Sequence, residues 1–151
     1  MHSLGSKILS LALISLPVAV SAEKYIDLNL GLAPSKSMLG VSYAQDLNEV
    51  NVGIKSFAFG NSGEYALQPG VSYNRYLKPG GFYGTATYLP VTFSQEGVEA
   101  GSILAGIGKS FQFTSWGIHL DANLATPLTG EFAQAWGYWI GAGVSYRFKL
   151  D

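Results

Sequence analysis

The chain has 151 residues, which is enough for one domain of ordinary size and too few for two. Charged residues make up only 13% of it and the formal net charge is -1, so it lacks the positive excess that holds a nucleic-acid backbone. The absence of cysteine excludes a disulfide framework, a thiolate metal site and a cysteine nucleophile.

The first 22 residues have the pattern of a secretory signal peptide. A short polar start ends at Lys7, residues 8–20 are almost entirely apolar, and small residues follow at Ser21 and Ala22, where a signal peptidase reads the chain. The apolar run has about 13 residues, whereas a helix needs roughly 20 to cross a bilayer. We therefore expect cleavage after Ala22, which leaves residues 23–151 as the mature domain.

The mature chain shows no convincing helical spacing and alternates instead with a period of two, which predicts β-strands. The first such segment, residues 24–33, has apolar residues at even positions and Asp27 and Asn29 at odd positions, which point to the opposite face. Comparable segments follow at residues 38–44, 50–59, 67–76, 82–91, 101–109, 116–126 and 138–148. The sequence therefore predicts about eight strands.

The segment of residues 82–91 is ambiguous in phase and contains Pro90. We expect Tyr83, Leu89 and Val91 to point outward there. A shift of one residue in this phase exchanges all the inward and outward side chains of the strand.

The links between the predicted strands alternate in length. The second, fourth and sixth links are compact: residues 45–49, 77–81 and 110–115. The odd links are rich in Ser, Gly, Pro and Glu, and two of them are longer than any even link: residues 34–37, 60–64, 92–98 and 127–134. Short turns at one end and longer loops at the other are typical of a bacterial transmembrane barrel.

Composition indicates which face is the interior. Charged residues are scarce while glycine contributes 19 residues and aromatic residues 13%, so we expect something other than water to solvate part of the molecule. A soluble barrel such as a lipocalin would enclose the large apolar side chains and expose a surface of Gly, Ser, Ala and Asn with few charges. The reverse arrangement directs the apolar side chains toward lipid and fills the narrow interior of an eight-stranded barrel with small and polar ones.

We therefore predict an all-β protein, an antiparallel up-and-down transmembrane β-barrel of about eight strands. A soluble periplasmic lipocalin-like barrel that binds an apolar ligand is the alternative. The interior of the transmembrane barrel would be lined by polar and charged side chains: Asp27, Asn29, Lys55, Gln68, His119, Asp121 and Arg147. Because hydrocarbon offers backbone groups no partners, the first strand must pair with the last. Asp27 and Arg147 are then expected to meet at the periplasmic end.

Aromatic side chains near the strand ends are expected to mark the two membrane interfaces. The periplasmic set is Tyr25, Tyr43, Tyr73, Tyr76, Tyr83, Trp116, Tyr146 and Phe148, and the outer set is Phe57, Phe59, Tyr88, Phe93, Phe132 and Trp136. Their alternative role is to fill the core of a soluble protein.

Apolar and aromatic residues stand at alternate positions along the last predicted strand: Ile140, Ala142, Val144, Tyr146 and Phe148. This pattern resembles the final strand of the small eight-stranded outer-membrane β-barrel superfamily, which commonly ends in Phe with an aromatic residue two positions earlier. Here Lys149, Leu150 and Asp151 still follow. The resemblance implies the outer membrane of a Gram-negative bacterium, with outer-membrane lipid and the barrel-insertion machinery as partners.

Catalytic and metal sites find little support. His119 and Asp121 share a strand face and Ser145 lies on the next predicted strand, and some barrels of the superfamily are lipid A deacylases that use His, Ser and an acid. Those enzymes have a His-x-Ser pattern on a lipid-accessible face, whereas His119 and Asp121 are expected to point inward and to be hydrogen-bonded there. We therefore predict no enzyme, no cofactor and no metal, since His2 is removed with the signal peptide.

The function that remains is a small structural or interaction barrel, with a narrow channel or a lipid-modifying barrel enzyme as further alternatives. The longest predicted external link, residues 127–134, is modest, and Glu131 and Phe132 are its candidates for contact with a partner. The sequence does not determine the oligomeric state.

Overall fold

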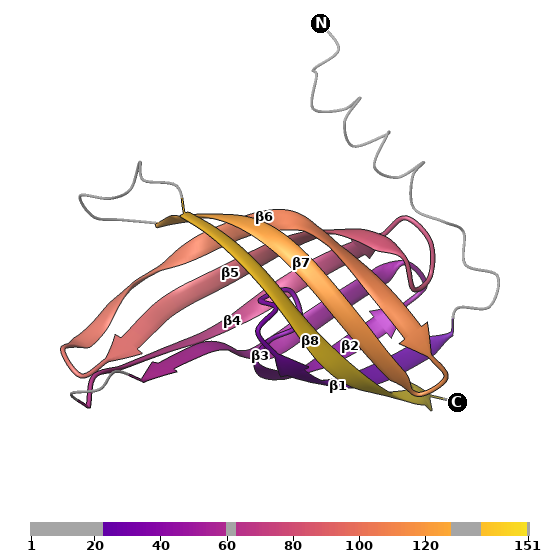
Figure 1. Ribbon diagram of the computed structural model, residues 1–151, viewed down its shortest axis with the longest axis horizontal. Coiled ribbons are helices and arrows are strands. Elements are labelled where there is room, and N and C mark those ends of the chain that lie inside the picture. The colour runs from indigo at the N-terminus through magenta and orange to yellow at the C-terminus, as the bar shows by residue number, and fades with distance from the viewer. Residues whose placement is uncertain (1–22, 60–62, 128–136, 151) are drawn as a thin grey trace, which may run out of the picture.

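The computed structural model describes residues 23–59, 63–127 and 137–150, which form a closed antiparallel β-barrel (Figure 1). Its strands are β1 (Lys24–Gly31), β2 (Leu39–Gln45), β3 (Asn48–Phe59), β4 (Tyr65–Tyr76), β5 (Phe82–Ser94), β6 (Gly97–Phe113), β7 (Trp116–Pro127) and β8 (Gly137–Leu150). Each pairs with its neighbour in sequence, and β1 pairs with β8. The predicted up-and-down barrel of eight strands is confirmed, whereas the predicted signal peptide lies outside the described residues.

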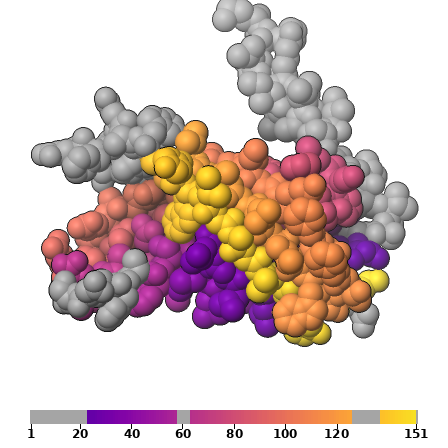
Figure 2. All heavy atoms as spheres, viewed as in Figure 1, coloured from indigo at the N-terminus to yellow at the C-terminus, as the bar shows by residue number. Residues whose placement is uncertain are grey.

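The barrel closes where the first and last strands meet. β1 and β8 are in register over their whole contact, from Lys24 opposite Leu150 to Gly31 opposite Gly143. The indigo β1 and the yellow β8 lie against each other on the face shown in Figure 2. Every strand therefore has a paired neighbour on both sides, although the shorter β1 and β2 leave the loop-end parts of β8 (before Gly143) and β3 (after Ile54) paired on one side only.

Several links are shorter than the sequence predicts. Only residues 114–115 separate β6 from β7 and only residues 95–96 separate β5 from β6, because these strands extend into the predicted links 110–115 and 92–98. We call the end that holds the links 46–47, 77–81 and 114–115 the turn end; β1 begins and β8 ends there. The opposite end is the loop end.

Apolar and polar side chains separate onto the two faces of the wall. Exposed apolar side chains occur on every strand, such as Leu30 at 59%, Ile107 at 69% and Ile140 at 74% exposure. The residues that alternate with them are buried and mostly polar, such as Asn29 and Asn51. In a closed barrel the buried positions face the lumen, so the interior of this barrel is hydrophilic.

The phase expected for β5 is wrong. Tyr83 and Leu89 are 2% and 1% exposed and face the lumen, and Val91 is half-buried, whereas Phe82 and Tyr88 lie outside. β5 has large side chains on both faces, so its apolar pattern does not distinguish them. Tyr76, also expected at the membrane interface, is 8% exposed inside the barrel, and its ring lies 4.9 Å from that of Tyr83.

A row of glycines opens space on one side of the lumen. Gly40, Gly53 and Gly70 are register partners across β2, β3 and β4. A Cβ atom at Gly40 would lie 2.7 Å from Cβ of Ser37, and one at Gly70 would lie 2.8 Å from the side chain of Leu89. The missing side chains therefore make room for what fills the lumen.

Candidate functional site

The link between β1 and β2 folds into the barrel, where Figure 1 shows it as an indigo loop inside the wall. Its residues 33–37 are all buried, and Ala33, Ser35, Lys36 and Ser37 are at most 1% exposed. We call residues 33–37 the plug. The expectation that this link is an external loop is wrong, because its small side chains fit the lumen and its polar groups find partners there.

Both ends of the plug are fixed to strands. The Leu32 N–H donates to the Ala142 carbonyl at 2.9 Å, and the Met38 N–H donates to the Ile54 carbonyl at 2.9 Å. Gly31, where the chain turns inward, has a φ of 152°, and a Cβ atom there would lie 2.4 Å from Cα of Gly143. Glycine meets both demands because it lacks a Cβ atom.

The wall supplies side-chain partners for the plug backbone, which would otherwise be buried without hydrogen bonds. The bonds are Asn74 Nδ2 to the Ser35 carbonyl (3.0 Å), Asn51 Nδ2 to the Lys36 carbonyl (3.0 Å), Ser72 Oγ to the Pro34 carbonyl (3.1 Å) and the Ser35 N–H to Asp121 Oδ2 (3.0 Å). Two hydrogen bonds join plug side chains to the wall: Ser35 Oγ bonds the Tyr83 hydroxyl at 2.9 Å, and Ser37 Oγ donates to Asn51 Oδ1. The plug is thus bonded to β3, β4, β5 and β7.

A buried ion pair joins the plug to β3. Lys36 Nζ lies 2.9 Å from Glu49 Oε2, and the two side chains are 1% and 0% exposed. The other carboxylate oxygen of Glu49 accepts a bond from Asn74 Nδ2 at 2.7 Å. The ammonium also lies 5.4 Å from the ring centroid of Tyr76 and 5.9 Å from that of Tyr83, within the range of cation–π attraction. Both charges are therefore compensated inside the lumen.

A second buried ammonium, Lys55, occupies an irregular position of β3. The β3–β4 register shifts between Ile54 and Ser56, so Lys55 is the extra residue of a bulge. Lys55 keeps the inward phase of Asn51, and the bulge places the next residue, Ser56, on the lumen side as well, where it bonds Gln68. Its Nζ donates to Asn51 Oδ1 at 2.5 Å and to Ser72 Oγ at 2.7 Å, which are also plug partners.

The other charged pair closes the barrel at its turn end. Arg147 Nε and one terminal nitrogen donate to the two carboxylate oxygens of Asp27 at 2.8 Å and 2.7 Å. The two residues are register partners of β8 and β1, and the guanidinium lies 4.4 Å from the ring centroid of Tyr25. The expectation that Asp27 and Arg147 meet is confirmed.

The lumen is hollow at the turn end. A cavity of about 310 Å³ opens there, and its lining includes Tyr25, Ala44, Tyr76, Ser110, Gln112 and Arg147. We call it the rim cavity. It reaches the ring of Tyr76, which Lys36 approaches from the plug side. The aromatic pair Tyr76 and Tyr83 therefore lies between the rim cavity and the plug.

The structure places the other expected interior residues on the lumen side of the wall. Asn29 donates to Ser42 Oγ at 2.8 Å, and the half-buried Gln68 bonds Ser56 and Thr92 at 2.7 Å and 3.0 Å. Asp121 accepts from Asn123 Nδ2 at 3.0 Å in addition to the plug N–H.

His119 is fully buried, yet neither ring nitrogen has a hydrogen-bond partner within the part of the chain that the structure describes. It therefore bonds neither Asp121 nor Ser145, whereas the histidine of a hydrolytic triad bonds both the acid and the serine. In the same described part, other buried atoms are also without partners: Asn29 Oδ1, Asn74 Oδ1, Tyr76 OH, Thr85 Oγ1 and Asn123 Oδ1. These atoms remain able to bond water, which satisfies such groups in folded proteins.

The alternating apolar and aromatic residues of the last strand, which resemble the final strand of outer-membrane barrels, lie on the outer face of β8. Ile140, Val144 and Phe148 are 74%, 42% and 46% exposed. Tyr146 contacts Trp116 and Phe148, with 4.9 Å between ring centroids in both pairs. Ala142 is exposed on the same face. The contact candidates Glu131 and Phe132 lie outside the described residues.

Sequence reasoning missed the plug and its ion pair. One signal was present, because the alternation of β3 puts Glu49 on the same face as Asn51. A carboxylate inside a narrow barrel needs a counterion, and Lys36 is a cation within a string of small residues, Ala-Pro-Ser-Lys-Ser.

Comparisons with protein-family models, with curated proteins and with solved structures found no match. Among residues 23–59, 63–127 and 137–150, no three His, Cys, Asp or Glu side chains are grouped to hold a metal ion. No helix in these same ranges is long and apolar enough to cross a membrane.

Proposed function

We propose that the mature chain is an integral β-barrel of the outer membrane of a Gram-negative bacterium, with a structural or interaction role. The observation that carries the proposal is the apolar outer face of the closed wall, with side chains such as Val52 at 54%, Ile107 at 69% and Leu124 at 56% exposure. Soluble monomers rarely expose apolar patches above a few hundred Å². Lipid is the solvent that suits a surface of this kind.

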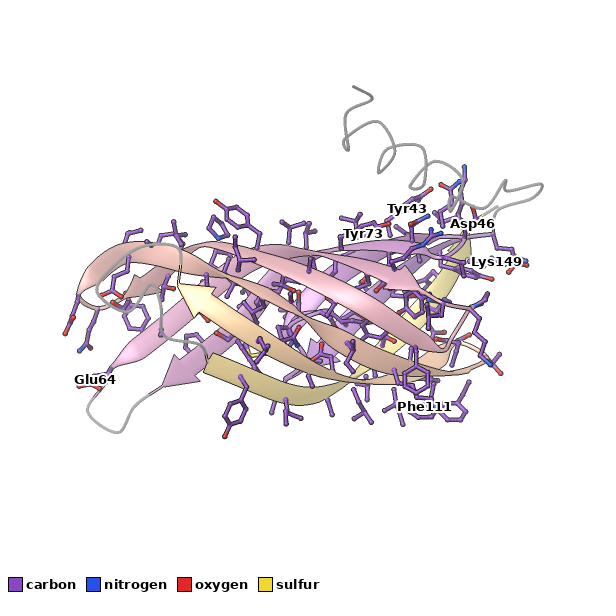
Figure 3. All side chains as sticks on the ribbon, turned by 90° about the horizontal axis from the view of Figure 1, so that it is seen from above. Tyr43, Asp46, Glu64, Tyr73, Phe111 and Lys149 are labelled. Carbon is purple, nitrogen blue, oxygen red and sulfur yellow. The ribbon has the colours of Figure 1, made fainter. Side chains whose placement is uncertain are left out.

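The turn end supports this reading because it has the residues of a membrane interface. Tyr43 and Tyr73 lie there beside Asp46 and Lys149 (Figure 3), and Tyr43 donates to Gln45 at 3.0 Å. Aromatic rings with polar tips favour the headgroup region, where one side is apolar and the other wet. Glu64 marks the opposite, loop end in the same view.

The interior argues against the soluble alternative, a lipocalin-like barrel with an apolar ligand. Such a ligand needs an apolar cup, whereas the centre of this lumen holds the plug and the Lys36–Glu49 pair. The signal peptide, the outer-membrane lipid and the insertion machinery that reads β8 belong to the same proposal.

Fractionation tests the proposal directly. The chain should sediment with outer membranes, require detergent for extraction and change gel mobility on heating, because a folded barrel runs differently from the unfolded chain. A matched pair of variants sharpens the test: Ile107→Lys should destabilise the inserted barrel by about 2–4 kcal/mol, whereas Ile107→Leu should have little effect. A detergent-free monomer in periplasmic extract would overturn the proposal.

A further inference from the structure

We propose that the plug is removable and that the lumen conducts small cations when the plug leaves it. This rests on the membrane location proposed above and adds an activity to it. The proposal begins with the hydrogen bonds between the plug and the wall. Asn51, Ser72, Asn74 and Asp121 bond plug groups at 3.0 to 3.1 Å.

A hydrophilic wall can exchange its partners for water. Each intramolecular hydrogen bond contributes little net stability, since the same groups bond water when they are exposed. An interior that has to stay filled is at least as stable when it is built from apolar side chains, and a buried ion pair offers no advantage there. The polar wall around the plug is therefore suited to being wet as well as filled.

Removal of the plug would empty the middle of the lumen. Beside the plug, Gly40 has no side chain to occupy the space that Ser37 leaves, whereas the Leu89 and Lys55 side chains already lie against Gly70. At the turn end, the rim cavity already reaches Tyr76, one ring away from the Lys36 ammonium. The plug and the Tyr76–Tyr83 pair together separate this cavity from the part of the lumen toward the loop end.

The charges of the wall favour cations. Lys36 belongs to the plug and leaves the lumen with it, and Asp27 and Arg147 neutralise each other at the rim. Of the buried charged groups that the structure describes, Glu49, Asp121 and Lys55 then remain on the wall. Two carboxylates against one ammonium leave a net charge of -1 on the wall. In the closed state the Lys36 ammonium occupies the place beside Glu49 that a passing cation would take.

Conductance of planar bilayers in KCl tests the proposal, with Lys36→Met and Glu49→Gln as variants. Each leaves one buried charge without its partner in the closed state, so each should raise the open fraction by a factor on the order of 100 to 1,000. The double variant Lys36→Met/Glu49→Gln removes both charges and should return the open fraction toward that of the parent. Glu64→Gln is the matched control, because it neutralises an exposed carboxylate away from the lumen.

Selectivity separates the two single variants. Under a KCl gradient, open Lys36→Met should prefer potassium, because Glu49 and Asp121 remain. The open Glu49→Gln variant should lose that preference, because the negative charge of Asp121 and the positive charge of Lys55 then cancel. Preference of Lys36→Met for chloride would overturn the cation assignment.

A thiol reporter provides an independent measurement, since the chain has no cysteine of its own. Ser35→Cys is buried while the plug is seated, so a membrane-impermeant thiol reagent should label it slowly. Adding Lys36→Met should raise the labelling rate. Single variants that insert and show the folded gel band, yet stay as silent and as unreactive as the parent, would overturn the proposal. Failure of the parent to float with lipid vesicles would instead overturn the membrane location.

Discussion

The two ion pairs of the lumen have opposite relations to solvent and to the chain. Lys36 and Glu49 are 1% and 0% exposed and connect a loop to the wall, whereas Arg147 of the rim pair is 21% exposed and bonds a partner on the adjacent strand. The rim pair follows from strand register and stabilises barrel closure. The plug pair depends on how a loop folds inward, so it stabilises one arrangement of the lumen.

Breaking the plug pair should have the largest effect. Lys36→Met leaves Glu49 buried and without its counterion, so the free energy of unfolding should fall by roughly 3–5 kcal/mol unless the plug leaves. Urea unfolding in lipid vesicles, followed by tryptophan fluorescence, measures this loss. Lys36→Met/Glu49→Gln is the control, and it should recover most of the stability. If the double variant were as unstable as the single one, packing and not charge would hold the plug.

Crowding the plug should have a smaller effect. In Gly40→Ala the new methyl group would lie 2.7 Å from Cβ of Ser37 in the plug and 2.7 Å from the Val52 carbonyl oxygen of the wall, so overpacking should cost about 1–3 kcal/mol. Gly84→Ala is the matched control, because a Cβ atom there meets nothing within 4 Å. Equal stability of the two variants in the same urea experiment would show that the plug does not need the space beside Gly40.

Breaking the rim pair should cost less than breaking the plug pair. Asp27→Asn removes the charge of a carboxylate that accepts two bonds from Arg147, and a loss of about 1.5–3 kcal/mol is expected. Water reaches the guanidinium, which limits the penalty. The exposed pair of Glu23 and Lys149 gives the comparison, since Glu23→Gln should leave the stability nearly unchanged. A loss for Asp27→Asn as large as that for Lys36→Met would contradict the contrast between the two pairs.

The strand register explains why one pair was predictable and the other was not. Alternation assigned Asp27 and Arg147 to the inner face, and closure of the barrel made them neighbours. No local pattern places residues 33–37 inside, because a loop has no fixed period. The inward phase of Tyr83 was hidden for a related reason: its hydroxyl partner is Ser35 in the plug, which is distant in sequence.

The amino-acid sequence by itself determined the strands, their up-and-down order and the polar interior, because a period of two follows from strand geometry and is written in neighbouring residues. Tertiary structure decided how the lumen is filled. The turn at Gly31 depends on its close approach to Gly143 of β8, and the space beside Gly40 and the pairing of Lys36 with Glu49 depend on a loop that folds back onto neighbouring strands, which no local pattern records.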